Sequence, residues 1–182
     1  MPLGAARFGL LGGVADLGKL QLIKTENPSA VTEVEFTNIA ESTYNVHFLT
    51  ANLTEATSQV EIQISNNGGT SYYTTGYQYA EQYGSVGGTF SESRSTNRDH
   101  IFTYGGSSSG LSKNGYTYFY NLGDSSKYSF ATSQFFGEHP TLINYFKFAM
   151  GVYPTAEIHN AIRLYTTGTF TGTVSLYGIA ES

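Results

Sequence analysis

Carboxylate side chains are the residues of this sequence that could carry out hydrolytic chemistry. Hydrolysis of a glycosidic bond needs two carboxyl groups, one kept protonated by an apolar pocket, at a separation of about 5 Å or of about 6.5–9.5 Å. The candidates are scattered along the chain and form no signature: Glu33, Glu35, Glu61, Glu81, Glu92, Asp99, Asp124, Glu138 and Glu157. Most fall on the polar side of an expected strand or in a loop. We therefore interpret them as solvated groups and rank a polysaccharide depolymerase third among the functions considered.

Metal and nucleophile chemistry has little support in the sequence. The four histidines have no His-x-His or His-Glu-x-x-His spacing that would aim two imidazoles at one ion: His47, His100, His139 and His159. His47 and His159 fall beside apolar residues, which favours a hydrogen-bonded structural role. The chain contains no cysteine, and no Gly-x-Ser-x-Gly elbow marks a serine nucleophile. We predict no metal site, no cofactor and no catalytic residue.

One local motif lies between two expected strand segments. Ser65-Asn66-Asn67-Gly68-Gly69-Thr70-Ser71-Tyr72 is similar to the Asp-box hairpin turn, Ser-x-Asp-x-Gly-x-Thr-Trp, of sialidases and many unrelated β proteins. It departs from that pattern because Asn67, Ser71 and Tyr72 stand where the motif has Asp, Thr and Trp. In such turns the polar side chains hold their own loop, so the motif predicts a structural role and no sialidase activity.

Tyrosine is abundant, with 15 copies, and four of these residues are candidates for contact with a glycan or a protein partner: Tyr72, Tyr77, Tyr79 and Tyr118. A tyrosine offers a flat apolar ring and a polar hydroxyl, which suits sugar stacking and protein interfaces alike. The alternative is that these rings line a core that contains no tryptophan. Tyr116, Tyr118 and Tyr120 alternate along one segment and are expected on one face of a strand.

The elements that would position these side chains are strands. Alternation of apolar and polar residues, which predicts strands with one buried face, marks these segments: 20–24, 32–36, 44–48, 60–65, 73–79, 101–104, 116–120, 128–131, 145–150, 158–164 and 170–176. The last two are joined by Thr166-Thr167-Gly168-Thr169, which predicts a hairpin. Gly, Asn and Ser turns separate short strands throughout. We predict an all-β fold, an antiparallel β-sandwich of jelly-roll type.

Two segments lack this alternation. Residues 1–19 are rich in Gly and Ala, which predicts an extended arm that docks outside the sandwich domain of residues 20–182. Leu3, Arg7, Phe8, Leu10 and Leu11 are its candidate docking residues. The polar stretch Gly84 to His100 is expected to be a long loop, and a loop of this length is usually functional or mobile.

The low content of charged residues and the net negative charge limit the kinds of molecule that this chain could bind. Charged residues make up 13% of the 182 residues, against roughly 25% in an average soluble domain. The net charge of −5 and the scattered basic residues argue against nucleic acid as a partner. No apolar run approaches the roughly 18 residues of a membrane span, and glycines interrupt the faintly leader-like residues 1–15.

The C-terminal segment carries a resemblance to a known group of proteins. Residues Ala161 to Tyr165, a Gly-Thr turn and the run Phe170 to Ile179 look like the closing hairpin of tailed-phage structural proteins. The opening Ala5 to Gly9 and the Asn-Gly-Gly turn after Ile64 resemble the same group, which includes marine phage virion proteins. The resemblance covers both ends and one internal turn, while the middle third is matched in composition alone.

The resemblance implies a β-sandwich on the outside of a phage particle, made in the host cytoplasm. It would be a capsid decoration protein, a head fibre or a tail-fibre appendage, assembled as a homo-oligomer, often a trimer, and bound to other virion proteins. We therefore expect a non-enzymatic structural protein in which the scarcity of charge reflects burial between subunits. The alternative is a receptor-binding or glycan-binding adhesion module of a tail fibre, with a host surface glycan as its partner.

Overall fold

A computed structural model describes residues 19–55, 58–104, 111–139 and 143–180. Every regular element in these ranges is a β-strand, which confirms the predicted all-β antiparallel class. The strands are β1 (Leu20–Glu26), β2 (Val31–Thr37), β3 (Val46–Glu55), β4 (Val60–Ser65), β5 (Tyr77–Ser85), β6 (Phe90–Arg98), β7 (Phe102–Tyr104), β8 (Leu111–Tyr120), β9 (Tyr128–His139), β10 (Ile143–Ala156) and β11 (Ala161–Ile179). This part of the chain holds no helix able to cross a lipid bilayer.

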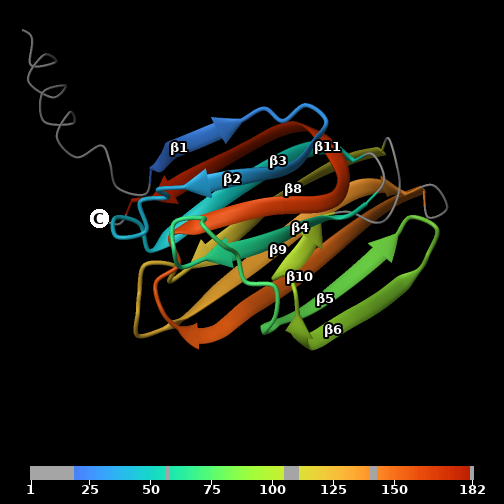
Figure 1. The fold of residues 1–182 in the computed structure, drawn as a ribbon. Helices are drawn as coiled ribbons and strands as arrows, with labels where there is room; N and C mark the ends of the chain where they lie inside the picture. Colours follow the sequence, from blue (N-terminus) through green and yellow to red (C-terminus); the bar gives the residue numbers. More distant parts are fainter. Residues whose placement is uncertain (1–18, 56–57, 105–110, 140–142, 181–182) are drawn as a thin grey trace, which may run out of the picture.

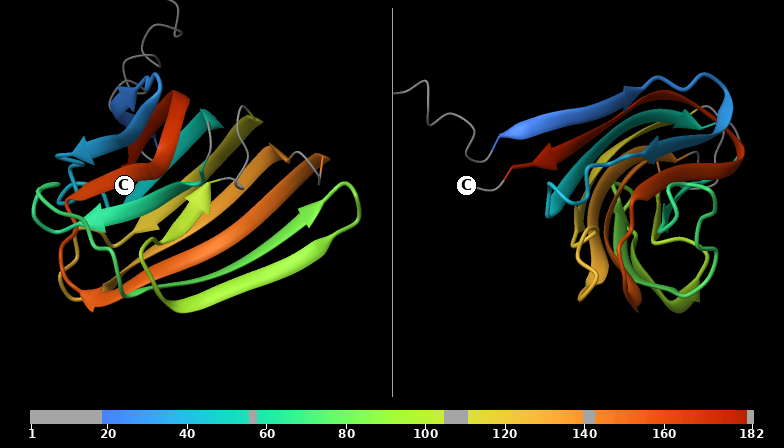
Figure 2. Two further views of the ribbon diagram at one scale, coloured as in Figure 1. Left: turned by 45° about the vertical axis from the view of Figure 1, so that its right-hand side comes forward. Right: turned by 60° about the vertical axis from the view of Figure 1, so that its left-hand side comes forward.

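The strands form one antiparallel sheet that curls over into an open half-barrel (Figures 1 and 2). The order along its main path is β6-β5-β10-β9-β8-β3-β11-β4-β7, and β1 and β2 also pair with β11. Strand β11 belongs to two layers, because residues 161–165 pair with β2 and β4, whereas residues 170–179 pair with β3 and residues 174–179 also with β1. Phe170, at the bend, pairs with β2 as well. The bend in this strand brings the two layers face to face, as in a sandwich.

The core lies between these two layers. Leu49 and Phe135 from the larger layer and Ile62 and Leu164 from the smaller one are each at most 1% exposed. Burial of a side chain of this size stabilises the fold by about 1.5–3 kcal/mol. Polar groups also cross the core, as where Lys147 Nζ on β10 donates to the hydroxyl of Thr103 on β7 at 3.1 Å. The apolar residues of some alternating segments, such as Val60, Ile62 and Ile64, face the interior, whereas those of others, such as Leu20 and Leu22, are exposed.

The predicted hairpin over residues 158–176 is wrong. Residues 161–179 form the single strand β11, and the Thr-Gly linker forms a shift in register between Tyr165 and Phe170. The two halves do not pair with each other, because each finds partners in a different layer. Gly172 adopts φ 147°, a conformation that L-residues rarely adopt, close to the bend. Turn-forming residues therefore mark a bent strand at this point.

The predicted long loop from Gly84 to His100 is also wrong over most of its length. Strands β5 and β6 form a hairpin, and the turn between them is closed by hydrogen bonds from Ser85 N to Thr89 O, 2.9 Å, and from Gly88 N to Ser85 O, 3.0 Å. Strand β6 lies at the edge of the sheet and its side chains are mostly exposed. A strand that covers no core needs no alternation, so hydrophobic periodicity could not identify it.

The first described strand begins at Leu20. The predicted arm residues Leu3, Arg7, Phe8, Leu10 and Leu11 lie outside the described residues.

Candidate functional site

The four tyrosines proposed as contact residues lie in different surroundings. Tyr77 is fully buried, so its ring is not available to a sugar. Tyr72 lies under the guanidinium of Arg163, 4.3 Å from the ring centroid, and burial raises the pKa of its hydroxyl. The Tyr79 hydroxyl is hydrogen-bonded on the inner side of β5, whereas Tyr118 faces outward from β8. They do not form one binding platform.

The turn after β4 is held by its own side chains, as the Asp-box similarity predicts. Asn67 Oδ1 accepts hydrogen bonds from Ser65 Oγ at 2.8 Å and Ser71 N at 3.0 Å, and Asn67 Nδ2 donates to Ser71 Oγ at 2.8 Å. Gly69 N donates to Ser65 Oγ at 3.2 Å. The Asn67 amide therefore both donates and accepts within this turn.

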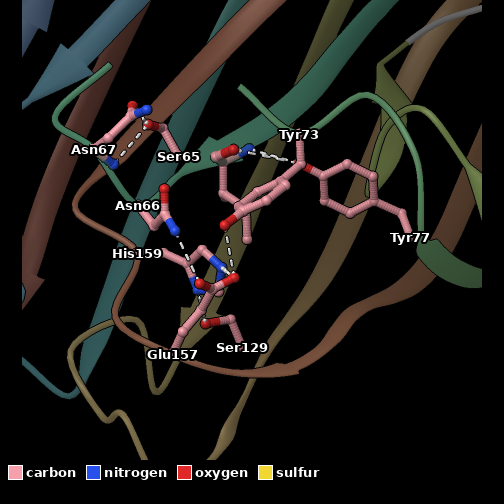
Figure 3. A network of polar contacts seen from close by, with 9 residues as sticks. Ser65, Asn66, Asn67, Tyr73, Tyr77, Ser129, Glu157 and His159 are labelled. Atoms are coloured by element: carbon pink, nitrogen blue, oxygen red, sulfur yellow. Dashed lines mark hydrogen bonds and ion pairs between the residues drawn. The ribbon is translucent and has the colours of Figure 1, made fainter. Parts of the chain in front are cut away.

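A partly buried polar network lies beside this turn (Figure 3). Glu157 accepts hydrogen bonds from the Tyr73 hydroxyl at 2.7 Å and from Asn66 Nδ2 at 2.9 Å. The ring nitrogen Nδ1 of His159 lies 2.7 Å from the hydroxyl of Ser129, and Nε2 lies 3.5 Å from Glu157. These contacts join the turn after β4, the start of β9 and the connection before β11.

The network contains a serine, a histidine and a carboxylate, the set used in nucleophilic catalysis. Ser129 and His159 are both fully buried, so a substrate has no access to the hydroxyl. Burial also lowers the pKa of His159 to about 4, an effect larger than the opposing attraction of Glu157. His47 is likewise buried and hydrogen-bonded, to Ile39 O at 2.8 Å. Both histidines are structural, as expected.

A second polar cluster, the Glu61–Asp99–His100 cluster, brings together residues that the sequence reasoning did not connect. His100 Nδ1 lies 2.8 Å from Asp99 Oδ1 and 3.5 Å from Glu61 Oε1. The donor atoms of all three residues lie within 4.8 Å of one another. Sequence spacing could not identify this cluster, because Glu61 is far from Asp99 and His100 along the chain. The strand β4 and the segment before β7 lie side by side, joined by the hydrogen bond from Ile101 N to Ile62 O at 2.9 Å, and this places Glu61 next to the other two residues.

The two carboxyl groups of this cluster differ in environment. Burial raises the pKa of Glu61, and the neighbouring Asp99 carboxylate raises it further. The Asp99 side chain is 56% exposed and that of Glu61 is 25% exposed. A carboxylate oxygen of each residue lies within 4.8 Å of the other, and retaining glycoside hydrolysis uses two carboxyl groups about 5 Å apart, one of them with a raised pKa. These three residues are also types that bind divalent cations.

An ion pair is buried near this cluster. Lys147 Nζ lies 3.1 Å from Glu81 Oε2, and both side chains are at most 10% exposed. The other candidate carboxylates have local partners or lie on the surface. Glu33 pairs with Arg163 at 3.0 Å, and Asp124 pairs with Lys127 at 2.8 Å. The sequence interpretation of these groups as surface carboxylates therefore fails for Glu81 and is incomplete for Glu61.

The outward side of the larger layer carries a broad set of aromatic side chains, here named the outer aromatic face: Phe48, Phe90, Tyr116, Tyr118, Tyr120, Phe130, Phe136, Phe146, Phe148 and Tyr177. The predicted alternation of Tyr116, Tyr118 and Tyr120 on β8 belongs to it. Phe136 and Phe148 are 47% and 46% exposed. Neighbouring rings contact each other across strands, as in Phe48 and Tyr118 with centroids 4.7 Å apart.

Formal charge is nearly absent from this face. Among the described side chains at the outward positions of β3, β8, β9 and β10, Glu138 near the end of β9 is the one charged residue. The lysines of these strands, Lys113 and Lys147, point inward and are buried. The net charge of −5 therefore resides elsewhere on the molecule. The uncharged polar positions Asn52, Asn114 and Gln134 lie among these rings, so the face is aromatic and uncharged.

Comparison with known proteins gives no family. No family model matches the chain, and no curated protein matches it. A solved structure of a hypothetical protein from Salmonella cholerae-suis, also called Salmonella enterica, matches 82% of this chain and 81% of that one, with 6% sequence identity and a TM-score of 0.23. A similarity of this size carries no argument about fold or function.

Proposed function

We propose that the chain is a non-enzymatic structural protein that assembles with copies of itself through the outer aromatic face. The observation that carries this proposal is the combination of exposed aromatic rings with an almost complete lack of charge over four adjacent strands. The centres of protein interfaces are enriched in Tyr, Phe and Met and depleted of Lys, Glu and Asp. The face has this composition.

A second copy of the chain is the occupant that the charge distribution favours. Two molecules of net charge −5 repel each other unless they meet through surfaces that carry little of that charge. The outer aromatic face is such a surface, and its apolar area is removed from water when two copies meet. Burial contributes about 25 cal/mol per Å² of apolar area, opposed by the entropic cost of association.

A charge placed on the face tests the proposal. Phe148→Asp puts a carboxylate at an outward position that is 46% exposed, where it costs little folding stability but would have to be buried in the assembly. We expect the unmodified chain to sediment as an oligomer at micromolar concentration and the variant to sediment as a monomer. Analytical ultracentrifugation gives the masses and decides whether the oligomer is the expected trimer.

The matched control is Ile158→Asp. Ile158 is 43% exposed but lies in the connection between β10 and β11, away from the outer aromatic face. It should leave the oligomer intact. The proposal fails if the unmodified chain is a monomer at every concentration tested, or if the two variants dissociate the oligomer equally.

The resemblance of the C-terminal segment supports the surface of a bacteriophage virion as the setting of this assembly. In this proposal, residues 1–19 anchor the chain to other virion proteins through Leu3, Arg7, Phe8, Leu10 and Leu11. Mass spectrometry of purified virions should detect the chain in stoichiometric amounts, and its absence would refute the virion role. Deletion of residues 1–18 should abolish incorporation into particles while self-association persists.

A glycan-binding adhesion module is the second candidate. It is favoured by the tyrosines of the outer aromatic face, whose rings lie beside amide side chains, as where the Tyr116 hydroxyl donates to Gln134. Flat rings with polar neighbours are suited to stacking against sugars. A glycan array with bound oligosaccharide, lost in Tyr118→Ala, would favour adhesion. An array without binding together with the oligomer described above would favour decoration.

A further inference from the structure

The geometry points to a binding site for a divalent transition-metal ion formed by Glu61, Asp99 and His100. Metal–ligand bonds of about 2.0–2.2 Å place neighbouring donor atoms about 3.0–3.5 Å apart in octahedral or tetrahedral coordination. The imidazole Nδ1 lies 2.8 Å from Asp99 Oδ1 and 3.5 Å from Glu61 Oε1, so these separations are close to those of ligands that share one ion. The site is independent of the proposed assembly face.

The burial and orientation of the His100 side chain also support a metal site. Its side chain is 3% exposed and its Nδ1 is directed at the two carboxyl groups. In the described part of the chain, this buried nitrogen contacts Asp99 Oδ1 at 2.8 Å, but the contact departs from good hydrogen-bonding geometry. A buried nitrogen without a hydrogen bond is costly. A metal ion would use its lone pair and remove that cost.

Two of the three ligand residues, Asp99 and His100, are held by their neighbours. Gln63 Nε2 donates to the backbone carbonyl of Asp99 at 2.7 Å, and Arg163 in turn donates to Gln63 Oε1. The ring of His100 stacks on Tyr79, with centroids 6.2 Å apart and an interplanar angle of 25°. Such surrounding contacts fix the direction of metal ligands and contribute to affinity.

The donor set selects the class of ion. One imidazole and two carboxylates suit Zn²⁺ or Mn²⁺ better than Ca²⁺ or Mg²⁺, which prefer oxygen ligands alone. Two carboxylate charges balance the charge of the ion. Two cations lie near the cluster: Lys147 is already paired with Glu81, and Arg98 lies close enough to act electrostatically on Glu61 and His100. Since Asp99 is 56% exposed, water can complete the coordination. The ion would fasten β4 to the connection between β6 and β7.

Titration of the full, untagged chain tests this inference. After treatment with a chelator and dialysis, the chain is titrated with Zn²⁺, and separately with Mn²⁺, by isothermal calorimetry. We expect one ion of at least one of these metals to bind per chain and, at about a hundredfold excess over Kd, the melting temperature to rise by about 5–10 °C. Failure of both ions to bind overturns the inference.

Asp99→Asn identifies the site. The side chain is exposed and the substitution keeps its shape, so the variant should fold, whereas replacement of the buried His100 risks unfolding. We expect Asp99→Asn to weaken binding about tenfold or more. The matched control is Asp124→Asn, which removes an exposed carboxylate from a distant turn and should leave binding unchanged. Equal affinity of Asp99→Asn and the unmodified chain would refute this site.

Discussion

At the scale of single residues, the chemistry of this protein consists largely of buried polar groups that pair with each other. The hydroxyl of Tyr104 is hydrogen-bonded to Thr117, and that of Ser129 to His159. Each pair offsets the cost of removing its members from water. The stability of the fold therefore depends on the protonation and integrity of these pairs.

His159 makes the stability dependent on pH. Burial lowers its pKa to about 4 in the folded chain, whereas the unfolded value is near 6.5. Between these two values the unfolded chain binds a proton that the folded chain does not, so the free energy of unfolding falls as the pH decreases below 6.5. The loss from this residue should reach about 2 kcal/mol at pH 5.

Urea unfolding at several pH values measures this effect. His159→Gln removes the titrating group, so its stability should depend less steeply on pH than that of the unmodified chain, even if it is less stable at neutral pH. His47, which also has a pKa lowered by burial, still titrates in the variant and retains part of the slope. Parallel curves for the two proteins would contradict the assignment to His159.

The buried ion pair gives a second prediction at this scale. Glu81→Gln leaves the ammonium of Lys147 buried without its counter-charge, and should lower the free energy of unfolding by about 3 kcal/mol. The double variant Glu81→Gln with Lys147→Met removes both charges and should recover at least half of that loss. Chemical denaturation of the unmodified chain, the single variant and the double variant measures these free energies of unfolding. A loss below about 0.5 kcal/mol in the single variant would show that the pair is not important for stability.

At the scale of elements, strand β11 determines how the sheet closes. It pairs with four other strands, two in each layer, and its bend allows both layers to share it. The edge strand β6 contrasts with it, because β6 pairs with β5 alone. We expect the fold to depend far more on the backbone of β11 than on that of the outer hairpin.

A substitution at Gly172 tests how strongly the fold depends on the backbone of β11. A Cβ atom there would lie 2.0 Å from Asn52 O on β3, and the φ of 147° is itself unfavourable for alanine. Gly172→Ala should cost about 3 kcal/mol or more of folding stability, measured by thermal or urea unfolding. Gly68→Ala is the matched control, since its φ is also positive but no atom lies within 4 Å of the added Cβ. Its cost should be about 1–2 kcal/mol. Equal losses would exclude close packing at the bend as the cause.

At the scale of the whole molecule, charge and aromatic residues are separated. The central strands of the larger layer present aromatic rings outward with almost no charge, while the edge strand β6 carries Glu92 and Arg94 on the same side. Edge strands with charged side chains resist open-ended pairing with other chains. The distribution favours association through the middle of the face over association along its edge.

Salt dependence distinguishes these two modes. Association through uncharged rings should change by less than about threefold between about 0.05 M and about 0.5 M NaCl, because there are few charges to screen. Association through the charged side chains of β6 should weaken markedly over the same range. Sedimentation equilibrium at the two salt concentrations measures the association constant. A tenfold or greater decrease of this constant at high salt would indicate that the interface lies at the charged edge strand β6.

The sequence by itself determined the all-β class and most of the strands, because alternation along a strand such as Val31–Thr37 reflects one buried face wherever its partners lie. It also predicted that Tyr116, Tyr118 and Tyr120 share a face. Tertiary structure alone decided which segments meet. The hairpin over residues 158–176 was wrong because pairing in different layers overrides a turn signal. Strand β6 was missed because it buries no apolar face.

The candidate sites divide in the same way. The self-contained turn at Asn67 could be predicted from its own residues, because its hydrogen bonds join neighbours in the chain. The cluster of Glu61 with Asp99 and His100, and the continuity of the outer aromatic face, depend on which strands lie side by side. Contacts between distant segments arise from the packing of the whole sheet, and local sequence patterns carry no record of that packing.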